Sequence, residues 1–487
     1  MTPKTIAQLI EPHLQKNLIQ KDYKLKNIKA KELLVHTRFD LAFKLLYLEN
    51  IDKKSKFSKE IYIEHIRAFS LGEYTERGNK EKNNISRFIE DFHNTFENIK
   101  TNGFDSSKTL IPLSKNGSIA NGAHRVASAI YVDKNVECID TNTTDPIYDY
   151  KFFYNRNVST KILDVVATKF IEYADNVYLA FIWPSAQGYD KEIEEVIPNI
   201  VYKKEITLNL NGAHNLLSQI YYGEKWVGSK EDNFRGSQGK LVECFRSFDP
   251  VRVVAFQANN LDEVLVVKDK IRAIFNIGKN SIHITDTKNE AIRVARVVLN
   301  DNSIHFLNHA KLSKYISTFT KIDNFKKFIK ENKLNKSEVL IDSSLILSCY
   351  GLREAKDTDF FCSDESKIKV RFDNINIHDE VLKYYQETKQ ELIYNPKNYF
   401  YFNELKFVSF YGLYKMKKNR AEIKDKNDCK MMEAFMEKDE VKMIINKFNQ
   451  NFYYGMIKVR HNLILFLDYI GLKKIIKKSI LYQFIKK

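Results

Sequence analysis

The residues from Ser114 to Ile130 constrain the fold more than any other segment of the chain. They predict a strand, a tight turn at Gly122 and a helix that opens with His124 and Arg125, which is a unit typical of α/β architectures. At such a turn a glycine lets the backbone approach an anion, the first helical N–H groups point toward it, and an arginine adds a rigid fork of donors. The segment therefore predicts a phosphate-binding turn. A plain strand–helix junction with a surface histidine and arginine is the equally weighted alternative.

The run Asn121-Gly-Ala-His-Arg125 resembles the Asp-Gly-His-His-Arg motif of the ParB/sulfiredoxin-like fold. A helix expected from residues 85 to 100 and a strand expected from residues 109 to 113 precede it in the order that this fold requires. The family includes nucleotide-dependent free-serine kinases and DNA-partitioning proteins. The resemblance implies that Asn121, Gly122, His124 and Arg125 bind phosphate, with His124 and Arg125 in the catalytic centre.

Asn121 stands where the kinases of that family carry an acid. If the acid serves as base or metal ligand, its role passes to another carboxylate, for which the candidates are Glu90, Asp91 and Asp105, with Glu64 as a further possible base.

Length and composition indicate about three closely abutting domains. The chain has 487 residues, 44% of them hydrophobic, with few glycines and prolines, so long linkers are not expected. Its five cysteines contain no Cys-x-x-Cys pair, which argues against a zinc ribbon or a disulfide framework and favours a reducing, cytoplasmic setting. We expect neither a signal peptide nor a membrane span. The formal net charge of +16 predicts attraction to an anion, whether nucleic acid, nucleotide phosphate or acidic lipid.

The middle third predicts a β-α-β-α-β-α-β order, which is an α/β sandwich. Its expected elements are strands at 177–184, 200–210 and 251–257, a polar, helix-permitting segment between the first two strands, and helices at 213–221, 262–272 and 290–299.

Residues 175 to 310 resemble the nucleoside diphosphate kinase fold, in which an Ile-Arg strand precedes Asn-x-x-His-x-Ser-Asp-Ser. The matching residues are Arg272, Asn280 and His283. The resemblance implies that Arg272 steadies phosphate, Asn280 contacts the nucleotide and His283 accepts a phosphoryl group. Trp183-Pro-Ser185 replaces the family's Lys-Pro-Asp. A degenerate domain that only binds a nucleotide, or holds its neighbours together, is the stronger alternative.

The last third carries the better enzymatic signal. It predicts a strand at 339–342, a polar turn with Ser343 and Ser344, a helix, and a return strand with Asp357 and Asp359. Alternate residues of a strand face the same side, and two carboxylates can hold Mg²⁺ against a triphosphate.

This order resembles the nucleotidyltransferase superfamily, whose pattern is Gly-Ser or Gly-Gly, a helix and Asp-x-Asp. The residues 416–428, with Lys-x-x-Arg and Lys-Asp-x-x-Asp, also fit that family. The resemblance implies Mg²⁺ on Asp357 and Asp359, Glu404 as the third metal carboxylate, and a nucleoside triphosphate such as ATP held by Ser343, Ser344 and Lys417. Asp342 or Ser343 stands where a glycine is usual.

Residues 463–487 alternate apolar side chains with paired lysines at helical spacing. This pattern predicts either a helix that lies on an anionic membrane surface or one that docks on the protein's own core. An enzyme at the inner face of the inner membrane would follow from the first alternative.

The sequence thus predicts an α/β multidomain protein with a helical and ParB/sulfiredoxin-like region (1–150), a ferredoxin-like, nucleoside-diphosphate-kinase-type sandwich (170–315), a nucleotidyltransferase-like domain (322–450) and a basic amphipathic tail (451–487). We expect a kinase or nucleotidyltransferase that uses Mg²⁺ and a nucleoside triphosphate on a small hydroxylated acceptor, in capsule or lipooligosaccharide biosynthesis. The competing classes are a ParB-like nucleic-acid-binding protein and an inactive nucleotide-binding scaffold. Nucleic acid is the less favoured partner, because no helix-turn-helix or aromatic-interleaved basic run is evident.

Overall fold

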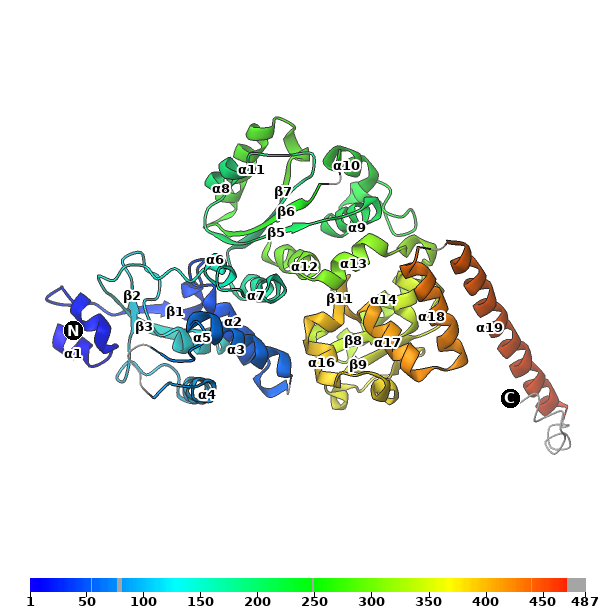
Figure 1. Cartoon of the computed structure of the whole chain (residues 1–487), viewed down its shortest axis with the longest axis horizontal. Coiled ribbons are helices and arrows are strands. Elements are labelled where there is room, and N and C mark those ends of the chain that lie inside the picture. Colours follow the sequence, from blue (N-terminus) through cyan, green and yellow to red (C-terminus); the bar gives the residue numbers. More distant parts are fainter. Residues whose placement is uncertain (54, 77–80, 248, 439, 471–487) are drawn as a thin grey trace.

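The protein is an α/β multidomain chain with three small sheets (Figure 1). The computed structural model describes residues 1–470 apart from 54, 77–80, 248 and 439. From the N-terminal to the C-terminal region, the strand orders of the three sheets are β1-β3-β2, β5-β6-β4-β7 and β10-β9-β8-β12-β11. In Figure 1 the four-stranded sheet lies above the other two, which sit side by side beneath it.

The N-terminal region places its three-stranded sheet against a layer of helices. Its elements are α1 (Pro3–Ala7), η1 (Pro12–Asn17), β1 (Lys26–Lys29), α2 (Asp40–Glu49), α3 (Lys56–Phe69), α4 (Ile85–Asn102), β2 (Ile111–Leu113), α5 (Ala123–Tyr131) and β3 (Asn135–Asp140). The central strand β3 runs parallel to β2 and antiparallel to β1. The helix, strand and second helix expected around the Gly122 turn are confirmed as α4, β2 and α5.

One hydrophobic core joins the N-terminal region to the middle region. Its buried residues extend from Ala30 to Leu307 and include the helices α6 (Tyr150–Tyr154) and α7 (Thr160–Tyr173). The ring of Phe39, at the start of α2, lies 6.1 Å from Phe170 of α7 and 6.4 Å from Tyr202 of the middle sheet, centroid to centroid. The two regions therefore fold against each other rather than around separate interiors.

The middle region is a four-stranded sheet in which every strand pair is antiparallel. Its elements are β4 (Val177–Ile182), α8 (Asp190–Val196), β5 (Ile200–Ile206), α9 (Leu210–Ile220), α10 (Ser237–Cys244), β6 (Val251–Gln257), α11 (Leu261–Phe275), β7 (Ile282–Ile284), α12 (Lys288–Val298) and α13 (Asp301–His309). The predicted alternation of strands and helices is confirmed.

The helix expected at 262–272 is confirmed as α11, so Ile271 and Arg272 lie on a helix and not on the strand that the nucleoside-diphosphate-kinase pattern has there. Asn260 caps the start of that helix, and Val264, Val267 and Ile271 recur at helical spacing and are buried against the sheet. The local period of three to four residues thus overrides the family pattern.

The C-terminal region has a mixed five-stranded sheet. Its elements are α14 (Ser317–Glu331), β8 (Val339–Asp342), α15 (Ser344–Cys349), β9 (Thr358–Cys362), β10 (Ile375–Ile377), α16 (Lys389–Tyr394), β11 (Tyr399–Phe402), β12 (Leu405–Val408), α17 (Phe410–Arg420) and α18 (Ile423–Met436). Strand β8 is central, antiparallel to β9 and parallel to β12. The strand, turn, helix and return strand expected from residue 339 onward are confirmed.

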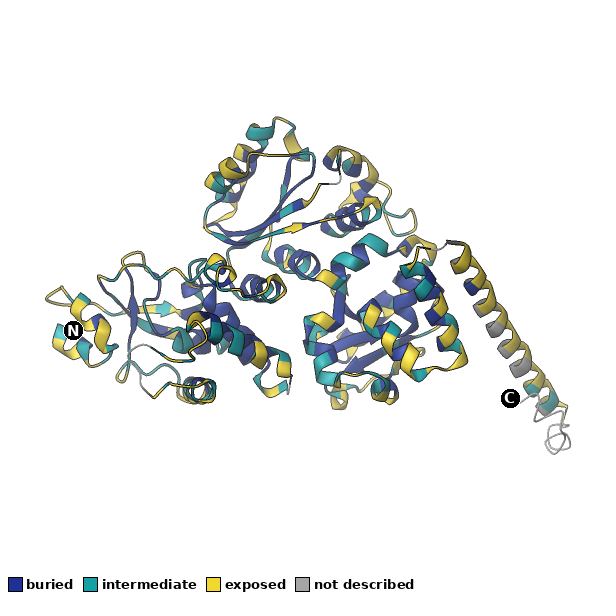
Figure 2. Ribbon diagram, in the orientation of Figure 1, coloured by how far each residue is buried: buried dark blue, intermediate teal, exposed yellow. Residues whose placement is uncertain are grey.

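The long helix α19 (Glu440–Tyr469) projects away from the rest of the molecule (Figures 1 and 2). Several of its large apolar side chains are exposed, among them Phe448, Phe452, Val459 and Phe466. Residues 471–487 of the predicted tail lie outside the described residues. Among the residues that are described, no helix combines the length and apolarity needed to cross a membrane.

Candidate functional site

The C-terminal sheet brings acidic side chains into one row. Asp342 at the end of β8 is the cross-strand partner of Asp359 on β9, and Asp359 in turn pairs in register with Asn376 on β10. Residues in register on neighbouring strands point to the same face of a sheet. The two carboxylates therefore lie close together on one face.

The turn between β8 and α15 completes this carboxylate row. Ser343 has φ +64° and ψ −134°, a backbone conformation that favours glycine and costs a serine about 1–3 kcal/mol. Ser344 follows it, and its Oγ donates to Oδ1 of Asp357 at 3.2 Å. The structure thus brings together Ser343, Ser344, Asp357 and Asp359, the four residues singled out in the sequence. Glycine adopts this backbone conformation without strain, which explains why the nucleotidyltransferase pattern has a glycine at this turn. This chain has Ser343 there, in a strained conformation.

Two residues that sequence reasoning missed fix Asp342. His378 Nδ1 lies 2.9 Å from one carboxylate oxygen and the Tyr385 hydroxyl donates to the other at 2.6 Å. Burial, with the charges of Asp357 and Asp342, raises the pKa of Asp359 to about 6 against the opposing effect of His378. The crowding of negative charge is the local electrostatic property that a divalent cation would relieve.

A buried ion network positions the loop that carries Asp357. Arg353 donates to both oxygens of Asp428 at 2.7 and 2.9 Å, and Lys417 lies 2.9 Å from Asp428 and 3.1 Å from Asp425. Asp425 also accepts from Arg420 at 2.6 and 2.8 Å. Lys417 is 2% exposed on its side chain, so it holds α17 and α18 together instead of presenting its ammonium group to a triphosphate.

The predicted third metal ligand is placed elsewhere. Glu404 lies in the turn between β11 and β12, where it is paired with Lys336 and lines a cavity to which neither Asp357 nor Asp359 contributes. Within the described residues, no group of three or more His, Cys, Asp or Glu side chains is arranged to hold a metal ion. A cation on Asp357 and Asp359 would therefore need its remaining ligands from substrate and water, as Mg²⁺ commonly does in nucleotide sites.

The Gly122 turn is tightly packed over Arg125. Gly122 has φ +89°, and a Cβ there would lie 2.9 Å from an Nη of Arg125 and 2.8 Å from Ile111. The Arg125 guanidinium is already bound to the Thr109 hydroxyl and to the carboxylate of Glu11. Arg125 thus lies against the turn, and its donors, which the sequence assigned to a phosphate, are engaged with protein groups.

His124 is likewise engaged. Its Nε2 lies 2.8 Å from the Tyr62 hydroxyl on α3, and burial, with the charges of Lys44 and Lys82, holds the pKa of His124 well below its ordinary value. The imidazole is therefore neutral near pH 7 and would contact a phosphate as a dipole, not as a cation. Asn121 uses its side-chain oxygen to accept from the N–H of Gly122.

Glu11 is the carboxylate that the structure brings to this turn. One of its oxygens pairs with Arg125, and the other is buried without a hydrogen-bond partner among the described residues. The acids expected from the sequence bind elsewhere: Glu90 and Asp91 pair with Arg87, Asp105 accepts from Ser107, and Glu64 pairs with Arg67. Glu11 is more than a hundred residues from the motif, and no spacing rule connects the two.

The three middle-region candidates have separate partners. His283 Nε2 lies 3.1 Å from Glu290, Arg272 pairs with Asp269 at 3.1 Å, and Asn280 accepts from Lys240 at 3.0 Å. His283 also packs on the ring of Tyr221, 5.0 Å between centroids. Among the described contacts none joins two of the three candidates, so the structure gives them no common phosphate site.

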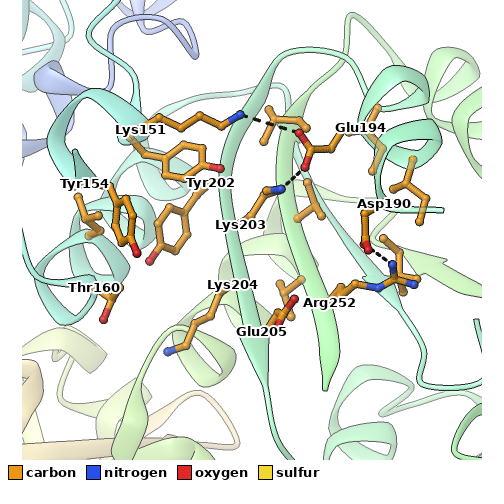
Figure 3. Close-up of a pocket in the computed structure, with 18 of the residues that line it drawn as sticks. Lys151, Tyr154, Thr160, Asp190, Glu194, Tyr202, Lys203, Lys204, Glu205 and Arg252 are labelled. Carbon is orange, nitrogen blue, oxygen red and sulfur yellow. Dashed lines mark hydrogen bonds and ion pairs between the residues drawn. The ribbon is translucent and has the colours of Figure 1, made fainter. Parts of the chain in front are cut away.

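A pocket of about 460 Å³ opens between α6, α7 and the edge of β5 (Figure 3). Its charged side chains are largely paired with each other: Glu194 binds Lys203 and lies 3.9 Å from Lys151, and Asp190 binds Arg252. None of the site residues predicted from the sequence lines it.

Comparisons with protein-family models, with curated proteins and with solved structures give no match to this chain. The three family resemblances therefore depend on the motifs and on the geometry described above.

Proposed function

We propose that the C-terminal region is a nucleotidyltransferase whose site is built from Ser343, Ser344, Asp357 and Asp359. The observation that carries the proposal is the strained turn at Ser343, which sets Ser344 against Asp357 beside the in-register pair Asp342 and Asp359. A glycine-type turn facing two carboxylates across a sheet is the arrangement that the motif implies.

In this proposal each residue has a distinct task. Asp357 and Asp359 would hold Mg²⁺, which would neutralise charge on the phosphates of a bound nucleoside triphosphate such as ATP. Asp342, fixed by His378 and Tyr385, keeps the potential at Asp359 negative and so favours cation binding. Ser343 and Ser344 would donate to phosphate oxygens. Arg353, through Asp428, positions the loop before Asp357.

A kinase-type activity of the N-terminal region is the second candidate. It is supported by the left-handed Gly122 turn, which opens the nine-residue helix α5, and by the buried, unpaired oxygen of Glu11 beside Arg125. Glu11 would take the role of the missing acid as general base toward a hydroxyl acceptor. We read this region as ParB/sulfiredoxin-like, and the antiparallel order β5-β6-β4-β7 as a ferredoxin-like sandwich of the nucleoside-diphosphate-kinase type that holds its neighbours together. The whole chain would phosphorylate or activate a small hydroxylated precursor of a surface polysaccharide.

Incubation of the full chain with each Mg-nucleoside triphosphate and a panel of serine, glycerol and sugars tests both candidates. Anion-exchange chromatography of the products should show pyrophosphate if the C-terminal site is active and nucleoside diphosphate if a kinase-type site is. Absence of turnover with every nucleotide would contradict both and favour the scaffold. Tight, salt-dependent binding to DNA in its place would favour a nucleic-acid function.

We also propose that α19 lies on an anionic membrane surface. Its exposed side chains Phe448, Phe452, Val459 and Phe466 recur at spacings of four or seven residues. From Glu440 to Lys487 the sequence has many more basic than acidic residues. The chain should sediment with phosphatidylglycerol vesicles and not with phosphatidylcholine vesicles, and Phe448→Ser with Phe452→Ser should remove most of the bound fraction. Equal sedimentation with both lipids, or a dimer that buries α19 in solution, would contradict this placement.

A further inference from the structure

A cavity of about 500 Å³ lies between the middle and C-terminal regions. Its walls come from α9 and α12 on one side, and from α14 and the β11–β12 turn on the other. This volume is within the range of about 300–1,000 Å³ typical of small-molecule sites, which often lie between domains. Glu404, which the structure places away from Asp357 and Asp359, lines it, whereas Ser343, Ser344, Asp357 and Asp359 do not.

The cavity has a surplus of positive charge. Lys336 pairs with Glu404, and Lys326 and Arg293 act on the same carboxylate: burial raises the pKa of Glu404, and the three cations together outweigh that effect and lower it. One carboxylate thus faces three cations.

Two of those cations have no acidic partner at ion-pair distance among the described residues. Lys326 Nζ donates to the side chain of Asn403 at 2.7 Å, and Arg293 donates to the carbonyl oxygens of Gln219 and Ile220 at the end of α9. Burial lowers the pKa of both Lys326 and Arg293. An anion in the cavity would supply a counter-charge that favours the protonated, charged form of both side chains.

Three aromatic side chains also line the cavity. The rings of Tyr222, Phe234 and Phe319 follow one another edge to face, with centroids 6.1 and 6.0 Å apart. Gln219 lines the same cavity, and its Nε2 is buried without a hydrogen-bond partner among the described residues. A buried amide donor without an acceptor is costly and is satisfied by a polar ligand atom.

We propose that this cavity binds a small molecule in which a phosphate is attached to a flat ring, as in a nucleoside monophosphate. The phosphate contacts Lys326 and Arg293, the ring packs on Tyr222 and Phe234, and an acceptor on the ring or sugar takes the Gln219 amide proton. The site is independent of the proposed nucleotidyltransferase centre, shares no residue with it and requires no metal ion. Because both regions contribute walls, ligand binding would also stabilise their association.

Calorimetric titration of the full chain in EDTA tests the site, with AMP and CMP as probes, and with ribose 5-phosphate and adenosine as the separated phosphate and ring. An Asp357→Asn, Asp359→Asn background removes the contribution of the proposed catalytic site. We expect saturable binding of a nucleoside monophosphate that is at least about tenfold tighter than that of either half.

Lys326→Met should weaken this binding about tenfold or more, whereas Lys327→Met, on the exposed side of the same helix, should leave it unchanged. Tyr222→Ser, at a side chain that is 55% exposed and so tolerant of change, should reduce the affinity for AMP toward that for ribose 5-phosphate. No saturable binding of any probe, equal binding by ribose 5-phosphate and AMP, or an unchanged affinity in both Lys326→Met and Tyr222→Ser would overturn the proposal. Each of these results leaves the proposed nucleotidyltransfer untouched, because the titrations exclude Mg²⁺.

Discussion

Asp359→Asn is expected to lower Mg-dependent pyrophosphate release from nucleoside triphosphates about a hundredfold or more. The substitution keeps the size of the side chain but removes the charge that would hold the cation beside Asp357, and groups that stabilise transition-state charge typically contribute this much to turnover. Asp357→Asn should have a similar effect, and the double variant should cost little more, because the two carboxylates act on one cation. Initial rates of pyrophosphate release measure all three variants.

Asp373→Asn is the matched control. This residue is exposed in the loop before β10, within the same region, and lies outside the carboxylate row. Its turnover should equal that of the unmodified chain, and the melting temperatures of all variants should show that they are folded. Unchanged pyrophosphate release in a folded Asp359→Asn variant would exclude the proposed site, whatever other activity the chain has.

Local order in the C-terminal region could be predicted from the sequence because short-range signals determine it. An apolar run ends at Asp342, a polar turn follows, and a carboxylate pair with alternate spacing opens the next strand. These features correctly located β8, α15 and β9 and brought Ser344 to Asp357. They also located the helices that flank Gly122.

Long-range pairing could not be predicted in this way. Lys417 has helical spacing suitable for a nucleotide clamp, yet Asp425 and Asp428 of the next helix neutralise it in the interior. Glu404 lies in the two-residue turn between β11 and β12, where it pairs with Lys336 of another element and not with a metal site. Glu11 reaches Arg125 only because α1 and η1 pack on the far side of the N-terminal sheet through Ile6, Ile10 and Leu14. Each case depends on which charges the tertiary fold makes neighbours, and local sequence does not encode that.

The buried carboxylate of Asp40 holds an ion network that reaches the segment before the Gly122 turn. It accepts from Arg38 at 2.8 and 2.9 Å and from Lys44 at 3.0 Å, and all three side chains are at most 3% exposed. Arg38 also donates to the carbonyl of Ile119, three residues before Gly122. The network therefore connects α2 to the segment that forms the turn.

Asp40→Ala is expected to lower the free energy of unfolding by about 3–5 kcal/mol, because it leaves two buried cations without their counter-charge. Denaturant titration followed by circular dichroism measures the loss. Asp133→Ala is the control, since Asp133 is 75% exposed and pairs with Lys29 at 3.6 Å across the surface, where such pairs contribute little. The Ile119–Gly122 segment should also lose protection from hydrogen exchange in Asp40→Ala, because Arg38 is no longer held in place.

The pH dependence of stability separates this charge effect from a simple cavity. Burial alone would raise the pKa of Asp40, but the charges of Arg38 and Lys44 outweigh it and hold that pKa well below its ordinary value. The stability that Asp40 contributes is therefore complete above the pKa of an unfolded aspartate, about 4, and declines as the pH falls below it, by up to about 1.4 kcal/mol for each pH unit. The unfolding free energy of Asp40→Ala should consequently fall less steeply below pH 4 than that of the unmodified chain, while the two curves run parallel above pH 5. Parallel curves over the whole acid range would mean that Asp40 contributes packing and not charge, and the ion network could then not be what fixes the turn.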